Sequence, residues 1–237
     1  STGGARELLD AARRFINQRI ERALSAPGTI LWNEMKQNAD ALSGGASPAA
    51  GLPMLYEAFK LSRSLGPFRL HLIGHSAGAI VHSFVADRLA QVGLVFASMS
   101  LMAPAVRLDT FQKRVLPYLQ TDTIDRYLQF SLTEQAEEQD LTCKPYLRSL
   151  LYLVSESFEA GVRTPILGMD RYFQQSGIAD QDRVTYITTP SAESPNATHG
   201  GFDDDTAVQK AIVDFVHASK SNKQTLPVSP AGLHAVA

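Results

Sequence analysis

The hydrophobic pattern changes character partway along the chain. In the first part, apolar residues recur at helical spacing, which predicts amphipathic helices over 6–24, 30–42 and 51–65. The segments 26–28 and 43–48 are rich in Gly, Pro and Ser, and they are expected to separate these helices. The N-terminal part is therefore predicted to be almost entirely helical.

Beyond this part, short apolar runs alternate with helical stretches. The runs predict strands at 68–73, 94–102, 150–155 and 184–188, and the stretches predict helices at 77–92 and 207–218. Strands that are apolar along most of their length are typical of a parallel sheet buried on both faces. The sequence therefore predicts an α/β fold with a mostly parallel sheet and flanking helices. We expect one domain over 1–218 and a flexible tail over 219–237.

The segment 107–146 interrupts this alternation. It contains helical pieces and an acidic stretch at 134–140. Because it lies between two predicted strands, it is expected to form a lid over the carboxyl edge of the sheet. A surface excursion without a function is the alternative.

Composition and charge exclude several classes of protein. Of the 237 residues 44% are hydrophobic and 19% charged, as in ordinary globular domains, and the net charge of −2 disfavours a nucleic-acid partner. The single cysteine, Cys143, cannot form an internal disulfide, and no signal peptide is visible, which favours the cytoplasm. No cluster has metal-ligand spacing and no Gly-rich loop fits a dinucleotide, so no metal or cofactor is expected.

The segment Gly74-His75-Ser76-Ala77-Gly78 fits the pattern G-x-S-x-G between a predicted strand and a predicted helix. A tight, strained turn there would project the Ser76 hydroxyl above the sheet, and Gly74 and Gly78 are expected to avoid Cβ clashes as strand and helix close together. The backbone N–H of Ala77 is the predicted oxyanion donor. An ordinary Gly-rich turn, with Ser76 capping the helix, is the alternative.

A serine nucleophile needs a base, and His199 is the predicted one. It lies in the loop between the last predicted strand and the last predicted helix, before an acidic run at 203–205 that suits a helix N-terminus. The other histidines lie in strands, helices, the Ser76 turn or the tail: His71, His75, His82, His217 and His234. A solvated loop histidine is the alternative for His199.

These features resemble the α/β-hydrolase superfamily over 68–218. The resemblance rests on the Gly74–Gly78 motif and on Thr198-His199-Gly200-Gly201, in the order that this superfamily uses. It implies attack by the serine, proton transfer by the histidine and a carboxylate that orients the histidine. We expect a carboxylic-ester hydrolase acting on a small or lipid-like acyl substrate. An acyltransferase with the same triad and a non-catalytic binding module are the alternatives.

The resemblance places the triad acid a few residues after the strand predicted at 150–155. Glu159 is the expected acid because it leaves room for a turn, and its carboxylate should approach Nδ1 of His199. Glu156, which directly adjoins the predicted strand, and Asp109, which follows the preceding one, are the alternatives. Asp170 lies further along the chain than this pattern requires.

The superfamily also has several strands before its nucleophile, and one of the loops after them supplies a second oxyanion donor. Here only the strand at 68–73 is predicted before Ser76. The remaining strands are therefore expected to come from a further N-terminal segment of the same protein, and this chain alone should have an open sheet edge. The loop 43–48 is the alternative source of the second donor.

Overall fold

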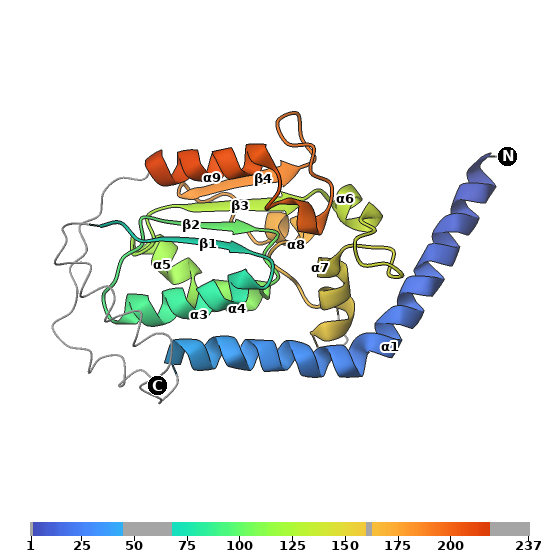
Figure 1. Cartoon of the computed structure of the whole chain (residues 1–237), viewed down its shortest axis with the longest axis horizontal. Coiled ribbons are helices and arrows are strands. Elements are labelled where there is room, and N and C mark those ends of the chain that lie inside the picture. The colour runs from blue at the N-terminus through green and yellow to red at the C-terminus, as the bar shows by residue number, and fades with distance from the viewer. Residues whose placement is uncertain (1, 45–67, 160–162, 219–237) are drawn as a thin grey trace.

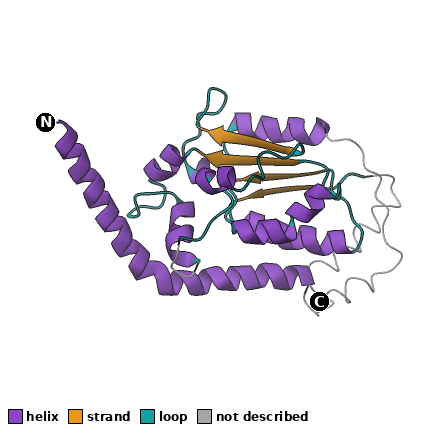
Figure 2. Cartoon of the chain, turned by 180° about the vertical axis from the view of Figure 1, so that it is seen from behind, coloured by secondary structure: helices purple, strands orange, loops and turns teal. Residues whose placement is uncertain are grey.

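The computed structural model describes residues 2–44, 68–159 and 163–218. A parallel sheet lies at its centre, with helices on both faces (Figure 1; Figure 2). Its strands are, in spatial order, β1 (His71–His75), β2 (Ser98–Met102), β3 (Tyr127–Leu132) and β4 (Val184–Thr189). All three pairings are parallel, which confirms the predicted α/β class.

The described helices include two that match their predictions closely, α3 (Gly78–Gln91) and α9 (Thr206–Ala218). The others are α1 (Thr2–Gly44), α4 (Leu108–Arg114), α5 (Leu116–Gln120), α6 (Glu134–Gln139), α7 (Leu150–Leu153) and α8 (Asp170–Gln175), with a π-helical turn η1 (Val154–Phe158) and a 3₁₀ turn η2 (His199–Gly201). Over the described part of the chain, no helix combines the length and apolarity needed to cross a membrane.

The lid prediction for 107–146 is wrong, because this segment contributes the third strand of the sheet. β3 pairs with β2 and β4 on its two sides and is buried along its whole length. Gln129 and Ser131 break the apolar run in the sequence, which concealed the strand. Their burial is tolerated because Nε2 of Gln129 donates to Oγ of Ser131 and to the carbonyl of Leu167, each at 3.0 Å.

The strand predicted at 150–155 is also wrong, because these residues form α7 and the start of η1. The hydroxyl of Ser149 caps the helix by accepting a hydrogen bond from the Tyr152 N–H at 3.3 Å. The run that follows is buried on all sides, and such a run has no periodicity that separates a strand from a buried helix.

The helices predicted at 6–24 and 30–42 are one helix, α1, which continues through 26–28. Pro27 has no N–H to donate to the carbonyl one turn earlier, and the helix bends near its middle (Figure 1). Its C-terminal half packs against α3 and η1, while its N-terminal half projects from the body. The helix predicted at 51–65 and the tail at 219–237 lie outside the described residues.

β1, the strand that leads into Ser76, lies at one edge of the sheet. Among the described residues, none pairs with its outer side as a further strand. The carbonyl of Ile73 on β1 instead accepts a hydrogen bond from Nε2 of His82 at 2.8 Å. That a further segment extends the sheet here stays a prediction.

Candidate active site

Ser76 occupies a strained turn between β1 and α3. Its φ is +52°, a left-handed conformation that non-glycine residues seldom adopt. Its backbone N–H donates to the carbonyl of Met102 at 2.9 Å, and its carbonyl accepts from the N–H groups of Ala79 and Ala105 at 3.1 and 3.0 Å. These bonds hold the turn to the end of β2, to the loop that follows β2 and to the first turn of α3, so the unfavourable conformation is fixed by its surroundings.

Only one of the two motif glycines is needed for close packing. A Cβ on Gly74 would lie 2.6 Å from Cδ2 of His82 and 3.3 Å from the backbone carbon of Gly78. A Cβ on Gly78 would meet no atom within 4 Å, so the predicted clash there is wrong. Of the two motif glycines, only Gly74 is therefore required for the close approach of β1 and α3.

The structure brings Ser76 and His199 together, as the sequence predicts. Nε2 of His199 lies 2.8 Å from Oγ of Ser76, although 123 residues separate them. His199 opens η2, the 3₁₀ turn between β4 and α9. Because the strands are parallel, the turns that follow β1 and β4 meet at the same edge of the sheet.

His199 is held through its backbone on both sides. Its N–H donates to Oδ2 of Asp140 at 2.8 Å, and its carbonyl accepts from Nε2 of His75 at 2.9 Å. The rings of His75 and His199 lie 5.3 Å apart, centroid to centroid. His75, a neighbour of Ser76 in the motif, thus helps to position His199, a contact that its place in the sequence did not indicate.

Burial lowers the pKa of the His199 imidazole to about 4. The nearby His75 ring lowers it further, while the carboxylates of Asp140 and Asp203 raise it. The ring is therefore neutral at pH 7. A neutral imidazole can accept the serine proton at Nε2 when Nδ1 carries its own hydrogen. Nδ1 is buried and has no hydrogen-bond partner in the described part of the chain.

Glu159, the predicted acid, does not reach His199. Its buried carboxylate accepts hydrogen bonds from Nε1 of Trp32 at 2.7 Å and from Nζ of Lys36 at 2.8 Å, both on α1. Nη1 of Arg107 lies 3.5 Å away as a third partner. The prediction that Glu159 contacts Nδ1 is wrong: this carboxylate fastens α1 to the body.

The alternative acids are engaged elsewhere as well. Glu156 pairs with Arg163 at 3.5 Å, and Asp109 pairs with Nε of Arg107 at 2.9 Å. Asp170 accepts a hydrogen bond from the Tyr186 hydroxyl at 2.8 Å. None of these contacts involves His199.

Asp140 is the functional candidate that sequence reasoning missed. It ends α6, the helix that follows β3, and it is 2% exposed. Its Oδ2 accepts from the His199 N–H, and its Oδ1 accepts from the N–H and the hydroxyl of Thr142. Recognition of β3 as a strand was the missing signal, because the acid would then have been sought after residue 132.

A second buried carboxyl, Glu137, lies one turn before Asp140 on α6. It is fully buried, and it accepts a hydrogen bond from the Ser149 hydroxyl. Burial raises the pKa of Glu137 to about 8, and the charges of Asp140 and Glu134 add to the effect. Glu137 is therefore largely protonated at pH 7.

Two solvent cavities of about 350 and 440 Å³ lie beside α1, and neither is lined by Ser76 or His199. Within the described ranges, no three His, Cys, Asp or Glu side chains are grouped so that they could hold a metal ion.

Comparisons of the chain with protein-family models, curated proteins and solved structures found no match. Function is therefore argued from the geometry of the site.

Proposed function

We propose that this chain is a serine hydrolase of the α/β-hydrolase type that cleaves a carboxylic ester. Ser76 is the nucleophile and His199 its base. The observation that carries the proposal is the 2.8 Å contact between Oγ of Ser76 and Nε2 of His199, made by a serine at a positive φ at the end of a parallel strand.

The proposed reaction follows from this contact. Nε2 of His199 takes the hydroxyl proton as Oγ of Ser76 attacks the ester carbonyl carbon. The resulting imidazolium then gives that proton to the leaving alkoxide, and the acyl group stays on Ser76. Water, deprotonated by the same histidine, then attacks the acyl carbon. The bond to Oγ of Ser76 breaks, the carboxylic acid is released, and the imidazolium returns its proton to Oγ. The Ala77 N–H and the N-terminus of α3 lie directly after Ser76, where they favour the negative charge on the carbonyl oxygen.

Asp140 replaces Glu159 as the proposed carboxylate of the triad. It is buried, it fixes the backbone of His199 by accepting its N–H, and its charge favours the imidazolium that forms during the reaction. Asp203 also raises the pKa of His199, but its side chain is exposed and its charge is screened by solvent. The order Ser76, Asp140, His199 along the chain is the order of the superfamily.

Labelling with a fluorophosphonate tests the proposal. Such a probe phosphonylates an activated serine, so the wild-type chain should be labelled at Ser76 and Ser76→Ala should not be labelled. Ser191→Ala removes an exposed serine and is the matched control, which should label like the wild type. Labelling of Ser76→Ala at the wild-type rate would refute the assignment. p-Nitrophenyl esters of increasing chain length would then define the acyl group.

A further inference from the structure

The N-terminal half of α1 is an amphipathic helix with its polar side turned toward the body. We call residues 2–24 the arm; it projects beyond the rest of the molecule (Figure 1). In most surface helices the apolar side packs against the core. In the arm the polar side faces the body and the apolar side faces outward.

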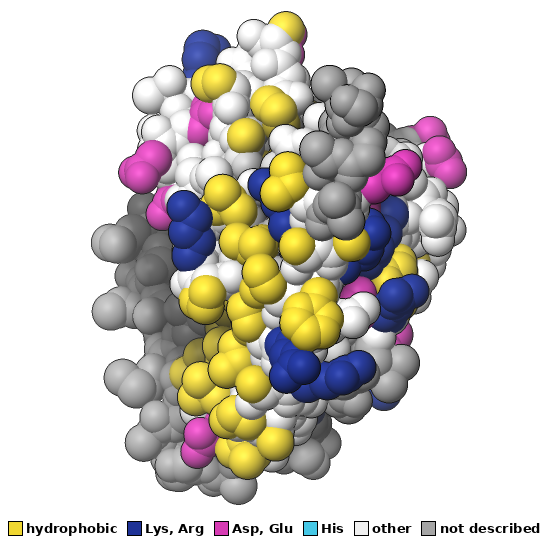
Figure 3. Space-filling model, turned by 90° about the vertical axis from the view of Figure 1, so that its right-hand side faces the viewer, with side chains coloured by type: hydrophobic (Ala, Val, Ile, Leu, Met, Phe, Trp, Pro, Cys, Tyr) yellow, Lys and Arg dark blue, Asp and Glu magenta, His cyan; other side chains and the backbone are white. Residues whose placement is uncertain are grey.

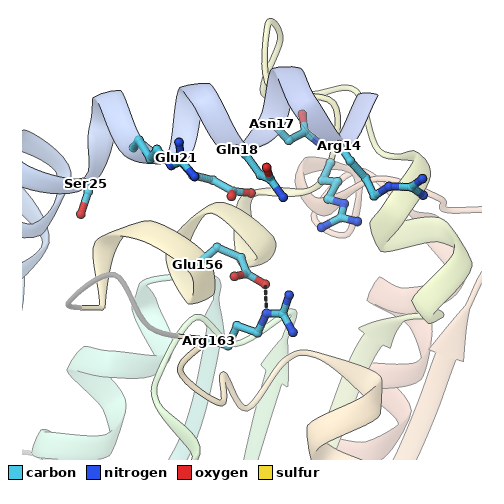
Figure 4. Close-up of a pocket in the computed structure, with 9 residues that line it drawn as sticks. Arg14, Asn17, Gln18, Glu21, Ser25, Glu156 and Arg163 are labelled. Carbon is cyan, nitrogen blue, oxygen red and sulfur yellow. Dashed lines mark ion pairs between the residues drawn. The ribbon is translucent and has the colours of Figure 1, made fainter. Parts of the chain in front are cut away.

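The inner side of the arm is polar and already has partners. Asn17 is buried, and its Oδ1 accepts the N–H of Leu147 at 2.9 Å. Glu21 accepts the Tyr146 hydroxyl at 2.8 Å. Other polar residues of this side face Glu156 and Arg163 across the cavity of about 350 Å³ (Figure 4). The body therefore satisfies the polar side of the arm and leaves the opposite side uncovered.

The outer side of the arm is apolar and exposed. At about 100° per residue, Leu9, Ala12, Ile16 and Ala23 fall within about 60° of one another around the helix axis, with Phe15 beside them. Leu9, at the edge of this sector, also lines the cavity of about 440 Å³, and Ile20, next to it around the axis, packs against the core. The side chains of Leu9, Phe15 and Ile16 are 66%, 58% and 42% exposed. Figure 3 shows a continuous band of hydrophobic side chains on the side of the molecule where the arm lies. We call this surface the outer face.

Arginines border the outer face. By the same helical geometry, Arg13 and Arg22 lie on its two sides, where each also lines the edge of one cavity beside α1. Arg19 lies within the outer face, 4.8 Å from the centroid of the Phe15 ring. The carboxylates of the arm, Glu7, Asp10 and Glu21, fall on the other side of the helix. Over residues 9–24, four arginines stand against two carboxylates, a net charge of +2 in a chain whose net charge is −2.

We propose that the outer face of the arm binds an anionic lipid surface. An exposed apolar stripe bordered by arginines is the pattern of helices that lie in the headgroup region, with the apolar side inserted and the arginines among the lipid phosphates. Pairing of two copies through the same face would instead bring Arg13, Arg19 and Arg22 against their equivalents. Charge therefore favours the lipid.

This binding goes beyond the proposed hydrolysis and does not depend on it. The strands run toward the side of the molecule on which the arm lies (Figure 1), so the edge of the sheet that bears Ser76 faces that side. Ser76→Ala should therefore bind lipid like the wild type, and vesicle binding and fluorophosphonate labelling can fail separately.

Vesicle flotation of the full chain tests the proposal. Vesicles of phosphatidylcholine with 30 mol % phosphatidylserine should bind the chain about 100-fold more strongly than pure phosphatidylcholine, since each of three arginines near the surface contributes about fivefold. The double variant Phe15→Ser/Ile16→Ser should lower partitioning by about 100-fold through lost insertion. Arg13→Gln/Arg22→Gln should lower it by about 25-fold on the anionic vesicles alone.

Arg14→Gln is the matched control, because Arg14 lies about 160° around the helix axis from Ile16 and lines both cavities between the arm and the body. It should bind within a few-fold of the wild type, and binding of the wild type should weaken as salt is added. Circular dichroism checks that each variant is folded. The proposal is overturned if the wild type ignores anionic vesicles, or if Phe15→Ser/Ile16→Ser binds unchanged. It is also overturned if the chain is a dimer that this variant dissociates.

Discussion

Two buried carboxylates, Glu159 and Asp140, show how neighbours decide what a charge can do. Glu159 is 3% exposed and is surrounded by Trp32, Lys36 and Arg107. Asp140 is 2% exposed, and its described donors are the backbone of His199 and the backbone and hydroxyl of Thr142.

The difference lies in the cations. Two cations, Lys36 and Arg107, form ion pairs with Glu159, so its charge serves to hold α1 against the body. Among the described residues no cation pairs with Asp140, and its field acts on the imidazole of His199. Both carboxylates are buried, so burial alone does not distinguish a structural carboxylate from one beside the proposed catalytic pair. The hydrogen-bond donors around each carboxylate do distinguish them.

The largest expected effect is on turnover by Asp140→Asn. The amide oxygen can still accept the His199 N–H, but the negative charge that stabilises the imidazolium is lost. We expect kcat for ester hydrolysis to fall by about 10³-fold or more with KM little changed. The acid limb of the pH–kcat profile should also move to lower pH, because the carboxylate raises the pKa of His199. An unmoved acid limb would show that Asp140 is merely structural.

The second effect is on stability at acid pH. The pKa of folded His199, about 4, lies below the value of 6.5 that an unperturbed histidine has in the unfolded chain. The unfolded state therefore binds more protons between these values, and stability that is complete above pH 6.5 is lost as pH falls toward 4. The loss should be about 3 kcal/mol.

Urea unfolding of wild type and His199→Gln across this range measures that loss. The variant should lack this part of the pH dependence, whereas His217→Gln, which changes an exposed histidine on α9, should retain it. Parallel curves for wild type and His199→Gln would contradict the lowered pKa.

The third effect is a loss of stability in Glu159→Gln with little change in kcat, the opposite of what is expected for Asp140→Asn. Glu159→Gln leaves Lys36 and Arg107 without their shared carboxylate, and because both cations are partly exposed the cost should be about 2 kcal/mol rather than the larger cost of a fully buried pair. kcat should stay within about threefold of the wild type where the variant is folded. Denaturant titration and ester assays on the same samples measure both. A large loss of kcat without a loss of stability would restore Glu159 as the acid.

The sequence alone was enough to predict those parts of the candidate site whose residues adjoin one another along the chain. The strand, the tight turn with Ser76 and the following helix adjoin one another, and His199 is followed by its own glycines and acidic run. The proposed acid, Asp140, could not be predicted in this way, because its position depends on which segment forms the third strand of the sheet. β3 contains the polar residue Gln129 and so does not look like a buried strand, whereas the apolar run 150–153 looks like a strand but forms a helix. In both segments tertiary packing decides the structure.

The last effect concerns Gly74 and Gly78, for which the sequence predicts the same role. Gly74→Ala should destabilise the chain by about 1–3 kcal/mol, because its Cβ would press on the His82 ring that is hydrogen-bonded to Ile73. Gly78→Ala meets open space at the first position of α3 and should be neutral or slightly stabilising. Thermal unfolding of the two variants compares them directly, and equal losses would contradict the geometry.

The pH dependence of phosphonylation at Ser76 tests most directly whether His199 is its buried base. The fluorophosphonate adduct would be located by peptide mass spectrometry and its rate of formation followed from pH 3 to 8. Because only the neutral imidazole accepts the serine proton, the rate should rise through pH about 4 and be level from pH 6 upward. A rate that rises through pH 6.5, as with a solvent-exposed histidine, or an adduct on another serine, would contradict the proposed site.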